Sequence, residues 1–298
     1  MSAQGGSMGT LDRFSVSPGR RRRDRIARSA ILGATLIALV PLVLIVYYLL
    51  RKGLGSWSTS FFTTDPTGNT FFKNSSIGGI KSAILGTIEI VGLASAMAIP
   101  VGIAVAVWLV EYGKESRFAQ TVRFGVDVLT GVPSIIFGLF IFIVLVVGTG
   151  STYAAYKGSC ALALLMLPVV IRSAEVILRL VPPALRESAL ALGAPRWRVI
   201  FRIILPTALP GLITGVLLAV ARAAGETAPL LFTAGYTLKS NFNLGQFMNA
   251  LPLQIYYDVT SPTTSIEHRA WGAALTLVSM ILLLNVLARL IARRSRIG

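Results

Sequence analysis

The sequence predicts an all-α membrane protein with six transmembrane helices. The chain has 298 residues, of which 54% are apolar and only 13% are charged, whereas a soluble domain carries about 25% charged residues. Long runs without any charge recur along the chain, and most Lys and Arg residues lie at the ends of these runs. This arrangement is typical of a chain whose solvent is lipid.

The composition argues against other classes of protein. The formal net charge of +16 is high enough for a nucleic-acid-binding protein, but the basic residues flank apolar runs, so we predict no nucleic-acid partner. The single cysteine, Cys160, and the single histidine, His268, exclude an intrachain disulfide framework and argue against a metal centre built on these residue types. We therefore predict no metal site in this chain.

Six segments are long and apolar enough to span a bilayer, which requires about 20 residues each. They are Ala30 to Leu50, Ala83 to Val110, Val128 to Thr152, Gly158 to Leu178, Ile203 to Ala221 and Ala270 to Ala288. The second contains Glu89, for which we favour a bond to a neighbouring helix over a place in a transport pathway. The fourth reaches spanning length only by including Arg172 and Glu175.

The distribution of Lys and Arg predicts that both termini are cytoplasmic. With the N-terminus inside, nineteen of these residues lie on the inner side and seven on the outer side, as the positive-inside rule requires. Residues 1–29 then form a basic cytoplasmic tail, and residues 30–298 form one six-helix domain in the bacterial cytoplasmic membrane. The first apolar run has 21 residues, which is longer than the core of a signal peptide, so we expect it to remain uncleaved.

The last outer connection, residues 233–269, is long enough to hold structure of its own. Its stretch "LGQFMNALPLQIYY" at 244–257 fits a short re-entrant or interfacial piece. An ordinary packed loop explains the same stretch equally well.

The inner loop at residues 183–206 has a distinct pattern. A short helix is expected from about Ala184, with Glu187 in its first turn, where a carboxylate favours the helix dipole. Gly193 stands at the usual glycine stop position, and a basic amphipathic stretch then leads into Pro206. These residues alone fit a hairpin among lipid headgroups as well as a docking site for a soluble partner.

The spacing within this loop resembles the EAA loop of ABC-importer permeases. The matching residues are Glu187, Ala189, Gly193, Ile203, Leu205 and Pro206, and Ser188 replaces the usual Ala. The resemblance implies a type I ABC-importer permease fold over about residues 80–292, with the coupling loop at 183–206. In that family the loop forms a coupling helix seated in a groove of the cytoplasmic ATPase. The resemblance therefore assigns the ATPase contact to Glu187, Ala189, Gly193 and Arg196.

The stretch "RAAGETAPLLFTAGY" at 222–236 resembles the PstA family of phosphate-importer permeases. This resemblance implies a subunit that forms half of a translocation pathway for inorganic phosphate. It also implies a PstC-like second permease, a PstB-like ATPase dimer, a PstS-like extracytoplasmic binding protein and membrane lipid as partners. The chain contains no G-x-x-x-x-G-K-[ST] sequence. We therefore expect a non-catalytic subunit without a cofactor of its own, with ATP and Mg²⁺ bound by the ATPase.

Ionisable residues inside apolar segments are the candidates for the pathway. A charge at mid-bilayer costs about 2.5 to 3.5 kcal/mol on insertion scales, so such residues face a bundle interior or a wet cavity. Arg222 and Glu226 are expected on one helix face, and Arg172, Glu175 and Arg179 share another. Spacing alone leaves structural ion pairs and an oxyanion pathway equally open. The resemblance assigns the pathway to Arg172 and Arg222, with Glu226 positioning and tempering the latter.

Two alternative functions are not excluded by these residues. A permease for another oxyanion, such as phosphonate, sulfate or molybdate, would use the same arginine chemistry. A self-sufficient secondary anion transporter would need no docking loop, so the EAA spacing argues against it.

Overall fold

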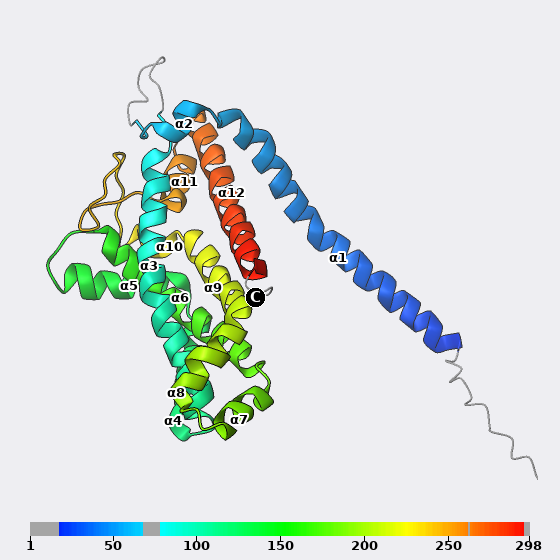
Figure 1. Ribbon diagram of the computed structural model, residues 1–298. Helices are drawn as coiled ribbons and strands as arrows, with labels where there is room; N and C mark the ends of the chain where they lie inside the picture. The colour runs from blue at the N-terminus through cyan, green and yellow to red at the C-terminus, as the bar shows by residue number, and fades with distance from the viewer. Residues whose placement is uncertain (1–17, 68–77, 262, 295–298) are drawn as a thin grey trace, which may run out of the picture. The chain divides into compact units, whose positions relative to one another are not determined.

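The computed structural model describes residues 18–67, 78–261 and 263–294, and these residues are almost entirely helical (Figure 1). In this part of the chain the only β interaction is an isolated bridge between Pro66 and Gly78. The chain divides into two compact units, residues 1–48 and residues 49–298. The predicted all-α class is confirmed.

Sixteen helical elements follow one another in the described residues. In chain order they are α1 (Pro18–Gly53), η1 (Leu54–Ser56), α2 (Thr59–Thr63), α3 (Lys81–Val107), η2 (Trp108–Gly113), α4 (Arg117–Gly131), α5 (Ser134–Ile141), η3 (Phe142–Val147), α6 (Ala155–Arg179), α7 (Pro183–Ala191), α8 (Arg196–Val199), η4 (Ile200–Ile204), α9 (Leu205–Ala224), α10 (Ala228–Leu231), α11 (Leu251–Val259) and α12 (Thr264–Arg294). Among the described residues, five helices are long and apolar enough to cross a membrane, and a bent pair supplies a sixth if it counts as one span.

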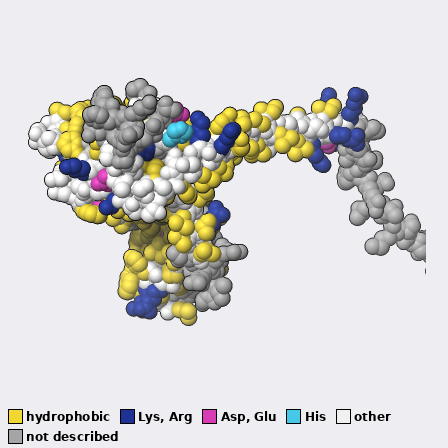
Figure 2. All heavy atoms as spheres, turned by 90° about the horizontal axis from the view of Figure 1, so that it is seen from above, with side chains coloured by type: hydrophobic (Ala, Val, Ile, Leu, Met, Phe, Trp, Pro, Cys, Tyr) yellow, Lys and Arg dark blue, Asp and Glu magenta, His cyan; other side chains and the backbone are white. Residues whose placement is uncertain are grey.

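The first predicted span lies in α1, which extends it back to Pro18. Figure 2 shows hydrophobic side chains along the length of α1, with Lys and Arg side chains at both of its ends. Such a helix suits a bilayer, because its apolar length contacts lipid and its basic ends contact headgroups. Residues 1–17 of the predicted tail lie outside the described residues.

The second predicted span is confirmed as α3, which continues into the π-helical turn η2. Turns of this kind are rare in proteins, and those that occur are often found at functional sites. The turn ends at Lys114, whose φ of 42° lies in the left-handed region, where a Cβ atom is disfavoured. The N–H of Ser116 bonds the carbonyl of Gly113 at 2.9 Å and closes a reverse turn.

The third predicted span, Val128 to Thr152, is wrong as a single helix. α4 ends at Gly131, and α5 with η3 follows at a bend of 101°. Pro133 causes the break, because it has no N–H for a helical bond and disfavours the helical conformation at the preceding residue. That residue, Val132, is accordingly extended, with φ −72° and ψ 130°.

The fourth predicted span is confirmed as α6, the central helix of the bundle. α6 packs against α3, α4, α5, α9 and α10, and its buried side chains form the main core with those of α3 and α9. Two glycines of α9 make the seam with α6 close: a Cβ at Gly211 would lie 2.6 Å from Ile177, and one at Gly215 would lie 2.6 Å from Ser173. Small residues allow membrane helices to approach in this way.

The fifth and sixth predicted spans are confirmed with longer boundaries. The basic stretch before Pro206 is not a separate interfacial helix, because α8, η4 and α9 form one apolar segment of 29 residues, Arg196–Ala224. α12 contains the whole of the sixth predicted span. Both helices therefore begin earlier in the chain than the charge-free spans predicted for them.

The connection between α10 and α12 holds a helix that begins at Leu251, later than the stretch predicted for it. This helix, α11, is joined to α12 by a buried ion pair. Asp258 accepts hydrogen bonds from Nε and Nη2 of Arg269 at 2.8 and 2.7 Å, and Gln254 donates to the same carboxylate at 2.7 Å. All three side chains are buried, so α11 is a packed part of the protein.

Candidate functional site

The coupling loop contains the short helix that the sequence predicts. α7 ends at Ala191, and Gly193 has a φ of 79°. The N–H of Gly193 bonds the carbonyl of Leu190 at 2.9 Å, and the N–H of Ala194 bonds the carbonyl of Ala189 at 3.2 Å. These two bonds form a Schellman motif, which requires a left-handed residue directly after the helix. Glycine is the residue that adopts this conformation without cost.

The other predicted coupling residues occupy different positions on this loop. Ala189 is 7% exposed and packs into the inner part of the core, whereas Glu187 and Arg196 are exposed. Glu187 does not lie in the first turn of its helix, because α7 begins at Pro183. The predicted stabilisation of Glu187 by the helix dipole is therefore wrong.

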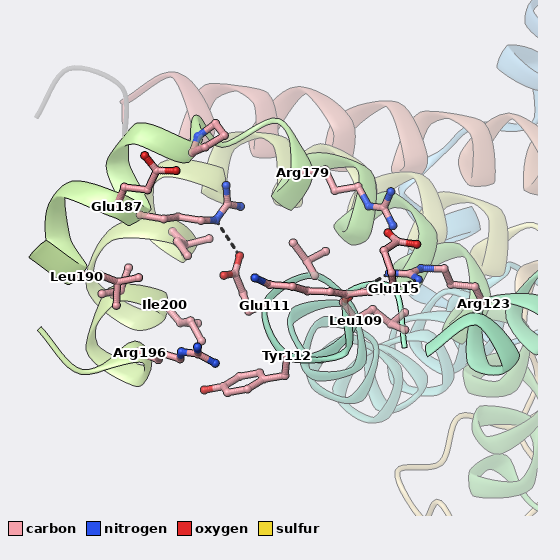
Figure 3. Close-up of a pocket in the computed structure, with 16 residues that line it drawn as sticks. Leu109, Glu111, Tyr112, Glu115, Arg123, Arg179, Glu187, Leu190, Arg196 and Ile200 are labelled. Atoms are coloured by element: carbon pink, nitrogen blue, oxygen red, sulfur yellow. Dashed lines mark hydrogen bonds and ion pairs between the residues drawn. The ribbon is translucent and has the colours of Figure 1, made fainter. Parts of the chain in front are cut away.

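A pocket of about 530 Å³ lies behind α7. Figure 3 shows Leu109, Glu111 and Tyr112 of η2 on one side and Glu187 and Leu190 of α7 on the other. Arg186 of α7 donates from Nε to Glu111 at 3.0 Å. Its Nη atoms donate to the carbonyls of Val181 and Leu178 at 2.7 and 2.8 Å. These bonds fix α7 to the C-terminal ends of both the α3–η2 helix and α6.

Glu175 of α6 is only 2% exposed, and three arginines donate hydrogen bonds to its carboxylate. Its Oε1 accepts hydrogen bonds from Arg123 and Arg179, both at 2.7 Å, and its Oε2 accepts one from Arg172 at 3.0 Å. The predicted shared face of Arg172, Glu175 and Arg179 is confirmed by these contacts. A buried carboxylate needs such partners, because an unpaired charge is costly in a low-dielectric interior.

Arg172 is held by a second carboxylate as well. Its Nε and Nη2 both donate to Oδ1 of Asp127 on α4, the former at 2.7 Å. The cluster of Arg123, Arg172, Arg179, Asp127 and Glu175 thus contains three guanidinium groups and two carboxylates, which leaves one positive charge in excess. The sequence reading did not identify Arg123 and Asp127 as partners. No local pattern contained this signal, because both contacts depend on how α4 packs on α6.

Arg222 stands in the last turn of α9, and its guanidinium is loosely held. Its Nε lies 3.5 Å from Oε1 of Glu226, and its side chain is 47% exposed. That separation is long for a hydrogen bond. Glu226 lies beyond the helix, because α9 ends at Ala224 and Gly225 caps it. The expectation that the two residues share a helix face is therefore wrong, although the ion pair forms.

The two predicted pathway arginines lie at different depths of the bundle. Gly215 of α9 lies against Ser173 of α6, the neighbour of Arg172, and Arg222 follows seven residues further along α9. At 1.5 Å per residue this separates the two arginine levels by about 10 Å. An open groove of about 670 Å³ is bordered by Arg172 and by Ala221, the residue before Arg222.

Glu89 of α3 is half-buried. Within the described residues no hydrogen bond or ion pair reaches its carboxylate, so the favoured bond to a neighbouring helix is not found there.

The fold and the coupling loop define a class of protein. Residues 98–297, more than half of the chain, match the model of the family described as binding-protein-dependent transport system inner membrane component. The chain belongs to this family. It is therefore a multi-pass protein of the cytoplasmic membrane, and its apolar helices agree with this.

Individual relatives narrow the class. The chain is 40% identical to phosphate transport system permease protein PstA 1 of Mycobacterium tuberculosis (strain CDC 1551 / Oshkosh), over 93% of this chain and 92% of the relative. It is 43% identical to PstA of Mycobacterium leprae (strain TN), over 91% and 89%, and 38% identical to PstA of Yersinia pestis, over 93% and 92%. Within its class the chain is a member of the PstA family of permeases.

Solved structures of ABC transporters share the fold. A chain of the MetNI methionine ABC transporter in an inward-facing conformation matches with a TM-score of 0.61 at 19% identity, over 72% of this chain and 94% of that chain. A chain of the bacterial alginate ABC transporter matches with a TM-score of 0.61 at 18% identity, over 92% and 96%. The expected type I ABC-importer permease fold is confirmed.

Proposed function

We propose that this chain is one permease subunit of an ATP-driven importer of inorganic phosphate. The observation that carries the proposal is the membership of the PstA family over more than nine-tenths of the chain. The exposed guanidinium of Arg222 supports it, because among the described residues its side chain has one long contact, with Glu226, and its other donors remain available to an anion. A planar guanidinium suits a phosphate group, which it binds with two parallel hydrogen bonds.

The two arginines act in sequence along the pathway. Their levels are about 10 Å apart, so a phosphate ion meets Arg222 and Arg172 one after the other. Glu226 beside Arg222, and Asp127 with Glu175 beside Arg172, compete with the ion for each guanidinium. This competition keeps binding weak enough for release, which a conducting path requires.

The coupling loop docks on a cytoplasmic ATPase, which binds ATP and Mg²⁺. Glu187, Gly193 and Arg196 form the exposed side of this contact, and Ala189 anchors the loop in the core. The chain is a non-catalytic subunit with both termini in the cytoplasm, in agreement with the excess of Lys and Arg on that side. Its partners are a PstC-like permease, a PstB-like ATPase dimer and a PstS-like binding protein.

The test is reconstitution of the chain with these partners in liposomes. We expect ATP hydrolysis to rise when phosphate-loaded binding protein is supplied on the outside, and labelled phosphate to accumulate inside. Excess unlabelled phosphate should compete with uptake, whereas sulfate, molybdate and a simple phosphonate should not. Competition by one of these three, with no competition by phosphate, would assign the other substrate. Uptake without the ATPase would instead indicate a secondary transporter.

A further inference from the structure

Arg123 of α4 uses all three nitrogen atoms of its guanidinium group. Its Nε donates to Oε1 of Glu175 at 2.7 Å, its Nη1 to the carbonyl of Lys114 at 2.7 Å, and its Nη2 to the carbonyl of Leu109 at 3.0 Å. The side chain is only 14% exposed. One residue therefore joins α4, α6 and the turn at the inner end of α3.

The two carbonyl groups belong to an unfavourable stretch of backbone. Leu109 lies in the π-helical turn, where the regular helical bonding pattern is interrupted. Lys114 has φ 42° and ψ −117°, a conformation that glycine adopts readily and other residues adopt at a cost. The hydrogen bonds from Arg123 therefore hold a turn that the backbone does not favour by itself.

This turn forms one wall of the pocket behind the coupling helix. Figure 3 shows Arg123 at the end of the pocket away from Glu187 and Leu190. Glu111 of the same turn accepts a hydrogen bond from Arg186 of α7 at 3.0 Å. A displacement of the turn is thus passed directly to α7.

The other end of this chain of contacts lies in the candidate pathway. Glu175, which Arg123 holds, is also held by Arg172 at 3.0 Å. An oxyanion that binds Arg172 competes with Glu175 for the same guanidinium. When the oxyanion displaces Glu175 from Arg172, Arg123 and Arg179 remain as partners of Glu175 in the described part of the chain, and its position relative to Arg123 changes.

We propose that Arg123 is a positioning residue that transmits the occupancy of Arg172 to the coupling helix. The inference rests on the proposed function, because it requires an oxyanion at Arg172. The route runs from Arg172 through Glu175 and Arg123 to the turn, and from Glu111 through Arg186 to α7. Coupling between two sites is reciprocal, so docking of the ATPase on α7 changes the oxyanion affinity at Arg172 by the same factor.

The experiment compares Arg123→Gln and Arg123→Lys with Arg117→Gln in the complete complex in liposomes. Arg117 is an exposed residue of the same helix whose side chain has no bonded partner in the described residues, so its loss removes an equal charge without breaking the route. The measured quantity is the ratio of ATP hydrolysis rates with and without phosphate-loaded binding protein, at matched amounts of assembled complex.

We expect Arg123→Gln to lower this ratio about tenfold, within the roughly 5- to 150-fold range that is typical of coupling between sites. Arg123→Lys should give an intermediate ratio, because an ammonium group keeps the charge but cannot make the three-way contact. Arg117→Gln should match the wild type. Where Arg123→Gln does not assemble, the ratio in Arg123→Lys decides by itself, and a wild-type value overturns the inference.

A second variant separates transmission from simple stabilisation of the fold. Glycine adopts the backbone conformation of Lys114 readily, so Lys114→Gly makes the turn less dependent on Arg123. We expect Arg123→Gln combined with Lys114→Gly to regain about threefold in the ratio relative to Arg123→Gln, with Lys114→Gly alone as the reference. A wild-type ratio in Arg123→Gln overturns the inference. A wild-type complex that phosphate-loaded binding protein does not stimulate overturns the proposed function instead.

Discussion

Nε of Arg186 on the coupling helix α7 lies 3.0 Å from Oε1 of Glu111 in η2, the continuation of α3. The two residues form an ion pair, and both side chains are less than one-fifth exposed. The contact bonds the coupling helix to the end of α3, although the two residues are 75 positions apart in sequence. Under the proposed docking of an ATPase on α7, a force on this helix would reach α3 through this contact.

Removal of one partner of this pair should weaken ATPase docking. We expect Arg186→Gln to reduce the ATPase that co-purifies with the permease several-fold, because Glu111 is left without its partner in a largely buried site. Glu111→Gln with Arg186→Gln should recover part of the loss, since no unpaired carboxylate remains. Equal co-purification in wild type and Arg186→Gln would show that the pair does not position α7.

Gly193 should be sensitive to conformation and not to side-chain volume. A Cβ at this position would meet no atom within 4 Å, but the left-handed backbone costs a residue with Cβ about 1 to 2 kcal/mol. Asparagine tolerates this conformation better than alanine. We therefore expect coupled transport to decrease from Gly193 to Gly193→Asn to Gly193→Ala. Measured uptake that is equal in the Asn and Ala variants would contradict a conformational role.

Arg222→Gln should abolish phosphate uptake while the complex still assembles. Loss of a charge-assisted hydrogen bond costs about 1.5 to 3 kcal/mol, which corresponds to about one to two decades in rate. Arg222→Lys should be partly active. If Arg222 served only Glu226, then Arg222→Gln with Glu226→Gln would restore uptake, because no unpaired charge would remain. We expect the double variant to stay inactive, and its recovery would remove Arg222 from the pathway.

The buried ion pair between α11 and α12 should support the stability of the outer side of the protein. Asp258→Asn removes the negative charge that accepts two hydrogen bonds from Arg269, and breaking a fully buried pair costs about 3 to 5 kcal/mol. We expect a clear fall in the melting temperature of the purified protein. Glu267→Gln is the matched control. Its pair with Lys52 is about half exposed at 3.5 Å and contributes only about 0 to 1 kcal/mol. Equal melting temperatures for the two variants would contradict the role of Asp258.

Both termini and the coupling loop should face the cytoplasm. In a Cys160→Ala background, a cysteine at exposed Lys239 should react with an impermeant thiol reagent added outside intact cells. A cysteine at Leu192, which is 88% exposed in the coupling loop, should react only after the membrane is opened. The reverse pattern would overturn the orientation.

The sequence predicted most of the long helices but few of the contacts between them. Uninterrupted hydropathy predicts where a helix must satisfy its own backbone, and α3, α6 and α12 agree with it. Mean hydropathy also predicted one continuous span across α4 and α5, because a single proline hardly changes the mean value of a run. Pro133 nevertheless prevents a continuous helix. The glycine at 193 was predictable, since the Schellman motif is a local pattern.

The partners of Arg172 show why the candidate site was only half predictable. Glu175 lies three residues away on the same helix, so helical periodicity alone places it within reach. Asp127 is 45 residues away from Arg172, and Arg123 is 52 residues away from Glu175. These contacts depend on how α4 packs on α6, which no local pattern contains.

The close seam between α6 and α9 restricts how the protein can move. With Gly211 against Ile177 and Gly215 against Ser173, sliding one helix along the other would drive side chains into backbone, and packed interfaces of this kind do not deform continuously. We therefore expect the two helices to move as one rigid body in the proposed transport cycle. The distance between the levels of Arg172 and Arg222 along this helix pair would then stay constant through the cycle. Under the proposed function, we expect access to the pathway to alternate through a tilt of this helix pair as a whole against the second permease subunit.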